Sequence, residues 1–475
     1  MVDKTDDDGR LKDQCGVVGL YSHDKKDVSP YMFYALFSLQ HRGQESCGMT
    51  TRDEKFHTEK DMGLVPEVFD LDKLEKLQGY MGIGHVRYST TGESKLENAQ
   101  PFVVAHSKCT MAIGHNGNII NSFELRKKLE ASGQAFVSTT DTEVIAQLII
   151  REFLKNNDIV ASIAEVMKTL VGSYSLTILT DNTLIGVRDP LGIRPLCLGR
   201  VDDTYILASE SVALDAISAE YIKDIAPGEI VVIDDRGVKS YKPFKLNRKA
   251  HCMFEYVYFA RPDSALNKVQ VYNVRERIGQ ILGESDGIEA DFVTAIPDSA
   301  IPFALGYSRS SGIPYREGLI KNRYVGRTFI LPSQKARELA VRFKLNPMSS
   351  EVKGKRIVLF DDSIVRGTTS SRVIGILKAS GAKEVHMRVG CPPIKSPCQL
   401  GIDMPTPEEL IASDKSVEEI RRYIGADSLR YSSIEELEEA IGMDEDELCL
   451  GCLTGDYPVD MSKYEQVLLS SFISR

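Results

Sequence analysis

Two carboxylates and a glycine- and hydroxyl-rich loop directly follow an apolar run in KRIVLFDDSIVRGTTSS, residues 355–371. Residues 357–360 are expected to form a strand that ends at Asp361 and Asp362, and a loop over 363–369 then opens a helix. Open α/β sheets bind ligands at the carboxyl ends of their strands, and helix N-termini bind phosphate. Paired carboxylates accept hydrogen bonds from ribose hydroxyls and hold Mg²⁺. The pattern predicts a sugar-phosphate site, and the absence of GxxxxGK[ST] excludes a Walker A loop.

A second candidate for chemistry is Cys15, which begins the apolar run CGVVGL after an acidic leader. We expect residues 1–14 to be a propeptide whose removal after Gln14 gives Cys15 a free α-amine. That amine then acts as general base for the thiol of the same residue, and no histidine is needed. Removal of Met1 alone cannot expose residue 15, so processing, expected to be autocatalytic, is required. Taken alone, CGVVG is more typical of a buried strand cysteine.

Nine cysteines occur in a chain without a signal peptide, which argues against a disulfide framework. Cys449 and Cys452 form a CxxC pair, and Cys252 and Cys398 are single thiols far from it. Four such thiols can enclose a [4Fe–4S] cluster. Zinc held by thiolates is the alternative, and four buried thiols without a ligand are the third interpretation. A cluster here is expected to be structural.

The elements that position these residues fall into two halves. Residues 15–245 hold many short β-branched runs with helical patterns at 29–40, 122–132 and 141–155, which predicts an α+β sandwich. Residues 246–475 read as strand–helix–strand units of a parallel sheet, with helices near 300–310 and 369–380. Two acidic amphipathic helices within 406–446 precede the CxxC tail.

Length and charge limit the classes of function. A chain of 475 residues is expected to hold two or three domains. The net charge is −10, and no basic face is visible in the sequence. Strong binding of nucleic acid needs such a face, so we predict no nucleic-acid partner. Residues 159–180 are apolar, but Glu165 and Lys168 interrupt them, so a core helix followed by a strand is expected rather than a membrane span. With no signal peptide, the protein is predicted to be cytoplasmic.

Several segments of the first half resemble class II glutamine amidotransferases: LQHRGQESCGM (39–49), GHVRYSTTGESKLENAQPF (84–102), GHNGNIIN (114–121), STTDTE (138–143) and RDPLGIRPLCLG (188–199). This family has an N-terminal-nucleophile fold, a four-layer sandwich of two sheets between helices. The resemblance implies a catalytic Cys15 and an oxyanion hole made by the Asn116 side chain and the Gly117 N–H. It further implies that Arg87 binds the glutamine α-carboxylate and Asp141 the α-ammonium.

Each of these roles has a plainer alternative. Arg87 could be a surface strand residue, and Asn116-Gly117 a hairpin turn, a conformation that can also aim an N–H into a site. Arg42 is expected to support the site.

The string DDSIVRGTTS resembles the signature of type I phosphoribosyltransferases. The resemblance implies that the carboxylates of Asp361 and Asp362 bind the ribose hydroxyls of phosphoribosyl pyrophosphate (PRPP). It implies that the loop binds the 5-phosphate of the same molecule. The implied PRPP-binding residues are Asp361, Asp362, Ser363, Arg366, Gly367, Thr368, Thr369 and Ser370. Residues 295–300 resemble the pyrophosphate loop, with Ser299 joining Asp361 and Asp362 as Mg²⁺ ligands. The basic segment 321–334 is interpreted as a lid over pyrophosphate rather than an ordinary solvated loop.

Together the halves resemble the amidophosphoribosyltransferase family, in its iron–sulfur subclass with Cys252, Cys398, Cys449 and Cys452 as ligands. The resemblance implies conversion of PRPP, glutamine and water into 5-phosphoribosylamine, glutamate and pyrophosphate, the first step of purine (IMP) synthesis. It also implies feedback inhibition by purine nucleotides and a homotetramer or homodimer. Glucosamine-6-phosphate synthase and asparagine synthetase share the first half but lack DDSIVRGTTS. A PRPP-sensing protein without catalysis is disfavoured because every catalytic position is present.

Overall fold

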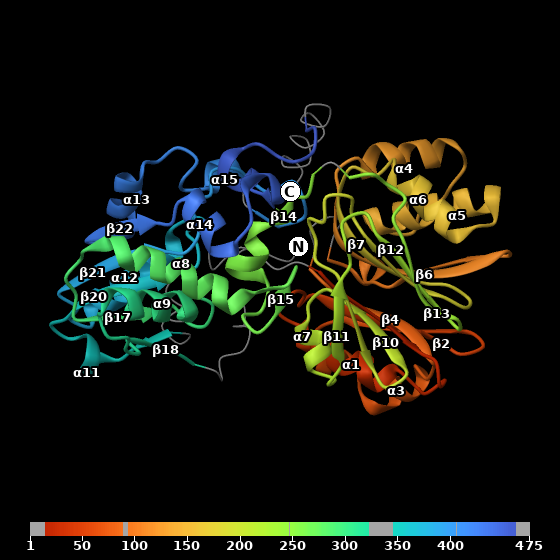
Figure 1. Cartoon of the computed structure of the whole chain (residues 1–475), viewed down its shortest axis with the longest axis horizontal. Helices are drawn as coiled ribbons and strands as arrows, with labels where there is room; N and C mark the ends of the chain where they lie inside the picture. Colours follow the sequence, from red (N-terminus) through yellow and green to blue (C-terminus); the bar gives the residue numbers. More distant parts are fainter. Residues whose placement is uncertain (1–14, 89–93, 247, 323–344, 405, 462–475) are drawn as a thin grey trace.

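The computed structural model describes residues 15–88, 94–246, 248–322, 345–404 and 406–461 (Figure 1). Its first half contains a seven-stranded sheet in the order β11-β9-β10-β1-β4-β2-β3 and a six-stranded sheet in the order β13-β12-β8-β7-β6-β5. The strands are β1 (Gly16–Ser22), β2 (Ser46–Arg52), β3 (Phe56–Met62), β4 (Met81–Arg87), β5 (Phe102–His106), β6 (Cys109–Ile119), β7 (Gly172–Leu179), β8 (Leu184–Arg188), β9 (Cys197–Val201), β10 (Thr204–Ala208), β11 (Glu220–Asp224), β12 (Ile230–Asp234) and β13 (Gly237–Tyr241).

Strand β1 lies at the centre of the seven-stranded sheet, and its side chains alternate between two cores. Val17 and Tyr21 point into the layer between the two sheets. Val18 and Leu20 pack on the other face, against the helices α1 (Ser29–Ser38) and α7 (Val212–Asp215). Successive residues of a strand point to opposite faces, so a run that is apolar throughout must be covered on both sides. The residues next to Cys15 are thereby fixed in the middle of the molecule.

Helices cover the outer face of the six-stranded sheet and complete four layers (Figure 1). They are α4 (Ser122–Ala131), α5 (Asp141–Asn156) and α6 (Ile159–Met167), close to the ranges predicted from the sequence. The Thr140 side chain caps α5 by accepting from the Glu143 N–H. The apolar stretch from 159 forms α6 followed by β7, as expected. The short helices α2 (Val65–Val68) and α3 (Leu71–Lys76) complete this half.

The second half is built on a parallel sheet in the order β17-β20-β21-β22. Its strands are β17 (Phe292–Ala295), β20 (Arg356–Asp361), β21 (Glu384–Val389) and β22 (Ser428–Tyr431), and its main helices are α8 (Val271–Asp286), α9 (Ile301–Ser311), α12 (Thr368–Ala379), α13 (Val417–Ile424) and α14 (Ile434–Ile441). The shorter elements are β14 (His251–Cys252), β15 (Ala265–Leu266), β16 (Val269–Gln270), β18 (Leu319–Lys321), β19 (Leu345–Pro347), α11 (Ser349–Val352), β23 (Leu448–Cys449) and α15 (Gly451–Thr454).

Helix α8 was not among the predicted elements. It packs closely on α9, and a Cβ built on Gly279 would lie 1.9 Å from the Phe303 carbonyl oxygen. The glycines that permit this approach weaken the helical signal in the sequence. Strand β22 was also missed because four residues between two helices give too short a pattern.

The tail returns to the start of the second half, where β23 pairs in parallel with β14. None of the helices in the described ranges is long and apolar enough to cross a membrane.

Candidate active sites

Cys15 lies just before β1 and is buried, with its Sγ 3.4 Å from the Tyr88 carbonyl oxygen. Burial raises the pKa of the Cys15 thiol, Arg87 opposes this increase, and Asp141 and Glu45 add to it. The charges of Arg87, Asp141 and Glu45 thus act on the sulfur. A thiol with a raised pKa needs a nearby base before it can attack.

Arg87 and Asp141 come from different layers, and both charges act on the Cys15 thiol. Arg87 is the last residue of β4, and its guanidinium lies 3.6 Å from the Glu45 carboxylate. Asp141 begins α5 and accepts a 2.9 Å hydrogen bond from the Ile119 N–H. Burial alone would raise the pKa of Asp141, but His115, 3.4 Å away, and the backbone N–H groups hold it below its usual value. The charges that act on the thiol therefore include a buried cation, Arg87, and an ionised carboxylate, Asp141.

Asn116 and Gly117 lie within β6, so the interpretation of this pair as a hairpin turn is wrong. The Asn116 side chain is 1% exposed, and neither its oxygen nor its nitrogen has a hydrogen-bond partner among the described residues. Because an unpaired buried amide is costly, both groups of this side chain are suited to hydrogen bonds with a bound ligand. Gly117 has φ +151°, and a Cβ there would lie 2.0 Å from the Ser173 carbonyl oxygen.

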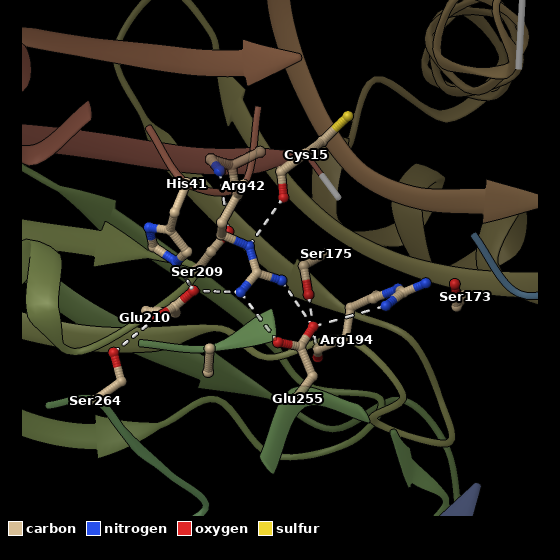
Figure 2. A network of polar contacts seen from close by, with 12 residues as sticks. Cys15, His41, Arg42, Ser173, Ser175, Arg194, Ser209, Glu210, Glu255 and Ser264 are labelled. Carbon is tan, nitrogen blue, oxygen red and sulfur yellow. Dashed lines mark hydrogen bonds and ion pairs between the residues drawn. The ribbon is translucent and has the colours of Figure 1, made fainter. Parts of the chain in front are cut away.

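Behind Cys15, a buried charge network connects the two halves (Figure 2). Arg42 Nε donates to the Cys15 carbonyl oxygen at 3.1 Å. Its guanidinium also pairs with Glu210 of the first half and, at 2.7 Å, with Glu255 of the second. Arg194 lies 3.6 Å from Glu255. Sequence analysis anticipated a supporting Arg42 but missed both acids, which belong to no recognisable motif.

Three further groups contact the Glu210 carboxylate, His41 at the same oxygen as Arg42 and the other two at the second oxygen. His41 Nε2 lies 2.7 Å from its carboxylate, the Ser264 hydroxyl donates at 2.7 Å, and the Arg261 N–H donates at 3.0 Å. Burial would raise the pKa of Glu210, but His41 and Arg42 hold it well below its usual value. The carboxylate therefore stays ionised inside the protein.

In the second half, the two acids lie where the sequence placed them. Asp361 ends β20, Asp362 follows, and both are buried at the edge of the parallel sheet. The hydroxyls of Ser299 and Ser363 donate to the Asp362 carboxylate, the latter at 2.9 Å. The 295–300 segment and the acid pair are thus brought together. The Gly390 and Cys391 N–H groups donate to the carbonyl oxygens of Asp361 and Asp362 and fix this strand end.

The loop after the acids leads into α12, as predicted. Gly367 stands at its N-cap with φ +75°, and Thr368, Thr369 and Ser370 form the first turn. Arg366 forms a 2.8 Å ion pair with Glu409. Buried Arg275 lies near Asp362, and burial lowers its pKa to about 10, although Asp362 opposes this. Most of the predicted lid, residues 323–334, lies outside the described residues.

The four late cysteines gather from three segments. Cys252 lies directly opposite Cys449 in the β14–β23 pair, and Cys452 follows in α15. Burial raises the pKa of the Cys252 thiol to about 12, and the neighbouring Cys398 adds to this. Cys452 is influenced by the other three thiols and by Cys391. Within the described ranges, no group of three or more His, Cys, Asp or Glu side chains is arranged as a metal site.

Comparison with known proteins finds matches for both halves of the chain. A family model for a glutamine amidotransferase domain matches residues 85–216, and one for a phosphoribosyl transferase domain matches residues 267–398. The amidophosphoribosyltransferase of Methanothermobacter thermautotrophicus is 56% identical, over 96% of this chain and 98% of the relative. That of Bacillus subtilis is 45% identical, over 97% and 96%.

Solved structures give the same result. The B. subtilis glutamine PRPP amidotransferase complexed with ADP and GMP superposes with a TM-score of 0.89 at 45% identity, covering 94% of this chain and 98% of that one. Two sites on one scaffold, and relatives that match nearly end to end, lead to one conclusion: this chain belongs to the amidophosphoribosyltransferase family.

Proposed function

We propose that this chain performs its family's reaction at two separate sites, with ammonia released at Cys15 and used at the Asp361–Asp362 loop. The enzyme is an amidophosphoribosyltransferase, which makes 5-phosphoribosylamine, glutamate and pyrophosphate from PRPP, glutamine and water in the first step of purine biosynthesis. The observation that carries the assignment of the first site is the buried Cys15 thiol, whose Sγ lies 3.4 Å from the carbonyl oxygen of Tyr88, the residue after Arg87, with the charges of Arg87 and Asp141 acting on it.

At the first site, Arg87 binds the α-carboxylate of glutamine and Asp141 its α-ammonium. These contacts present the side-chain amide to Cys15. The α-amine of Cys15, freed by removal of residues 1–14, takes the thiol proton. The thiolate then attacks the amide carbon, while Asn116 and the Gly117 N–H stabilise the oxyanion. Ammonia leaves, and water hydrolyses the γ-glutamyl thioester to glutamate.

At the second site, Asp361 and Asp362 hold the ribose hydroxyls, and Ser363, Arg366, Gly367, Thr368, Thr369 and Ser370 surround the 5-phosphate. The donor set fits Mg²⁺, because carboxylates and hydroxyls are hard oxygen ligands. Asp361, Asp362 and Ser299 would hold the ion, which when bound would supply positive charge to neutralise the pyrophosphate leaving group. Ammonia enters at C1 as the C1–pyrophosphate bond breaks.

For the cysteines we propose a [4Fe–4S] cluster held by Cys252, Cys398, Cys449 and Cys452. Cys252, Cys449 and Cys452 are buried, Cys398 is half-buried, and Cys252 lies opposite Cys449 in the β14–β23 pair. The gathering of these thiols from segments up to two hundred residues apart supports a shared ligand, because four cysteine thiolates can hold a [4Fe–4S] cluster. The cluster is structural in this proposal. Zinc remains the alternative, and metal and sulfide analysis distinguishes the two.

The remaining proposals concern organisation and regulation. We assign residues 1–14 to a propeptide, 15–245 to the glutamine amidotransferase domain and 246–475 to the phosphoribosyltransferase domain. Purine nucleotides are proposed as inhibitors because a relative's structure holds ADP and GMP. A homotetramer or homodimer, the cytoplasmic location and the lack of a nucleic-acid partner stay predictions from the sequence.

The test of the first site is mass spectrometry of active protein quenched with acid during turnover of glutamine. The account predicts a chain that begins at Cys15 and carries a γ-glutamyl adduct on that residue. Full glutamine-dependent activity from an unprocessed chain, or an adduct on another residue, would refute the assignment.

A further inference from the structure

A short segment of the second half, residues 399–401, lies directly against the strands of the first half that carry Asn116 and Gly117. The Gln399 carbonyl oxygen accepts from Asn118 Nδ2 at 3.1 Å. The Leu400 carbonyl oxygen accepts from the Ser173 hydroxyl at 2.7 Å and also from the Arg194 guanidinium. Figure 2 shows Ser173 beside the end of the Arg194 side chain.

These contacts fall on the residues next to Gly117. Asn118 follows Gly117 in β6, and Ser173 of β7 is the strand partner of Asn118. The Ser173 carbonyl oxygen is the atom nearest to a Cβ built on Gly117, which shows how tightly this backbone is enclosed. The side chains of Ser173 and Arg194 are fully buried. The position of the Gly117 N–H is therefore set from both halves of the molecule.

Gly401 completes the contact. Its φ is +97°, and a Cβ there would lie 2.9 Å from Arg194 Nη2, 3.1 Å from the Gly117 carbonyl carbon and 3.2 Å from Asn118 Cβ. A side chain at position 401 would push directly on the backbone of Gly117. The Gly117 backbone and the buried Arg194 side chain cannot move aside as an exposed side chain could, because the protein interior is closely packed.

We propose that segment 399–401 of the second half is a positioning element for the glutamine site, which holds Gly117 where its N–H can stabilise the oxyanion. This inference rests on the proposed assignment of Asn116 and Gly117 to the oxyanion hole. Its consequence is that glutamine hydrolysis in the first half depends on docking of the second half. Ser173, Asn118 and Arg194 are then positioning residues, which act through the backbone around Gly117.

The test is Gly401→Ala, with Gly133→Ala as matched control. Gly133 has φ +90° with no atom within 4 Å of a built Cβ, so it carries similar backbone strain without the contact. Loss of a well-placed oxyanion donor costs about 10²–10³-fold in kcat, so a displaced donor should cost at least about tenfold. We expect that loss in glutamine-dependent kcat for Gly401→Ala, with the KM for glutamine nearly unchanged.

Two readouts separate positioning from general damage. Synthesis from added ammonia should stay near the wild-type rate, and so should alkylation of Cys15 by iodoacetamide, which forms no oxyanion. Ser173→Ala removes the hydroxyl that donates to Leu400 and creates no clash. It should show a smaller loss of glutamine-dependent kcat, and it tests the proposal if Gly401→Ala fails to fold. Equal behaviour of the Gly401 and Gly133 variants, or parallel loss of ammonia-dependent synthesis, would overturn the proposal.

Asn116→Ala, assayed alongside, separates this inference from the site assignment. If Asn116→Ala keeps full glutamine-dependent kcat, the oxyanion hole itself has been misassigned. If Asn116→Ala loses activity while Gly401→Ala and Ser173→Ala do not, only the role of segment 399–401 is wrong.

Discussion

Individual buried charged residues fix the positions of the residues around Cys15. Arg42 is almost fully buried between the carboxylates of Glu210 and Glu255 and at the same time donates to the Cys15 carbonyl oxygen. Replacement of both partners of a buried ion pair by apolar residues changes stability little. Removal of one partner is destabilising, because it leaves an uncompensated buried charge. The network therefore fixes geometry, and its single members should be sensitive to substitution.

Arg42→Met should destabilise the protein by about 3–5 kcal/mol, because two buried carboxylates lose their shared cation. The matched control is Arg422→Met, since Arg422 is exposed and pairs with the exposed Glu418 at 2.9 Å. That change should fall within about 0.5 kcal/mol of wild type, as surface pairs do. Urea denaturation measures both, and equal midpoints for the two variants would contradict the importance of the network.

The pH dependence of stability should also report on Glu210. The pKa of Glu210 is lower in the folded state than in the unfolded chain. The stability that its ionised carboxylate contributes is therefore present above the unfolded pKa of about 4.3, and it is lost as the pH falls toward the folded pKa. The difference in denaturation midpoint between wild type and Glu210→Gln should therefore narrow as the pH falls below about 4. A difference that stays constant between neutral and acidic pH would show that the Glu210 charge does not contribute to stability.

Among the elements, strand ends and helix starts carry the predicted chemistry, and these could be read from the sequence. The strand at 357–360, its two acids and the helix near 369 are local patterns, as are α1, α4 and α5. Helix α8 could not be recognised because its glycines serve contact with α9, a tertiary feature with no local signal. Glu210 and Glu255 were missed for the same reason: only the folded chain brings them to Arg42.

Gly367→Ala tests the loop at the start of α12. Gly367 has φ +75°, and a Cβ there would lie 2.7 Å from Ile411 Cδ1. Gly425→Ala is the control, since Gly425 also has φ +75° but ends α13 with no atom within 4 Å of a built Cβ. We expect the KM for PRPP to rise about tenfold in the first variant only, equivalent to about 1.4 kcal/mol. Steady-state kinetics with ammonia in place of glutamine isolates this effect.

For the whole molecule, the tail is joined to the start of the second half by the β14–β23 strand pair, and the halves are joined by Arg42, Glu255 and segment 399–401. The sequence predicted two domains and four clustered cysteines from spacing and resemblance. It could not predict that residues near Cys398 would contact the glutamine site, because contacts between domains leave no periodic pattern.

A cluster held by the four cysteines should contribute directly to stability, because the site does not exist in the unfolded chain. Cys449→Ser, purified without oxygen, should lose iron and sulfide and unfold at lower temperature. Cys47→Ser is the matched control, since Cys47 is equally buried but lies in the first half, on β2. Active protein with one zinc ion and no sulfide would establish the alternative metal, and active protein with neither would leave four ordinary core thiols.

The division of the reaction between two sites is tested most directly by measuring 5-phosphoribosylamine synthesis from glutamine and from added ammonia in Cys15→Ala and Asp362→Asn. The account predicts that Cys15→Ala loses synthesis from glutamine and keeps synthesis from ammonia, because the second site needs only ammonia and PRPP. Asp362→Asn should impair both routes to the same degree. Loss of the ammonia route in folded Cys15→Ala, or retention of the glutamine route, would contradict the two-site account.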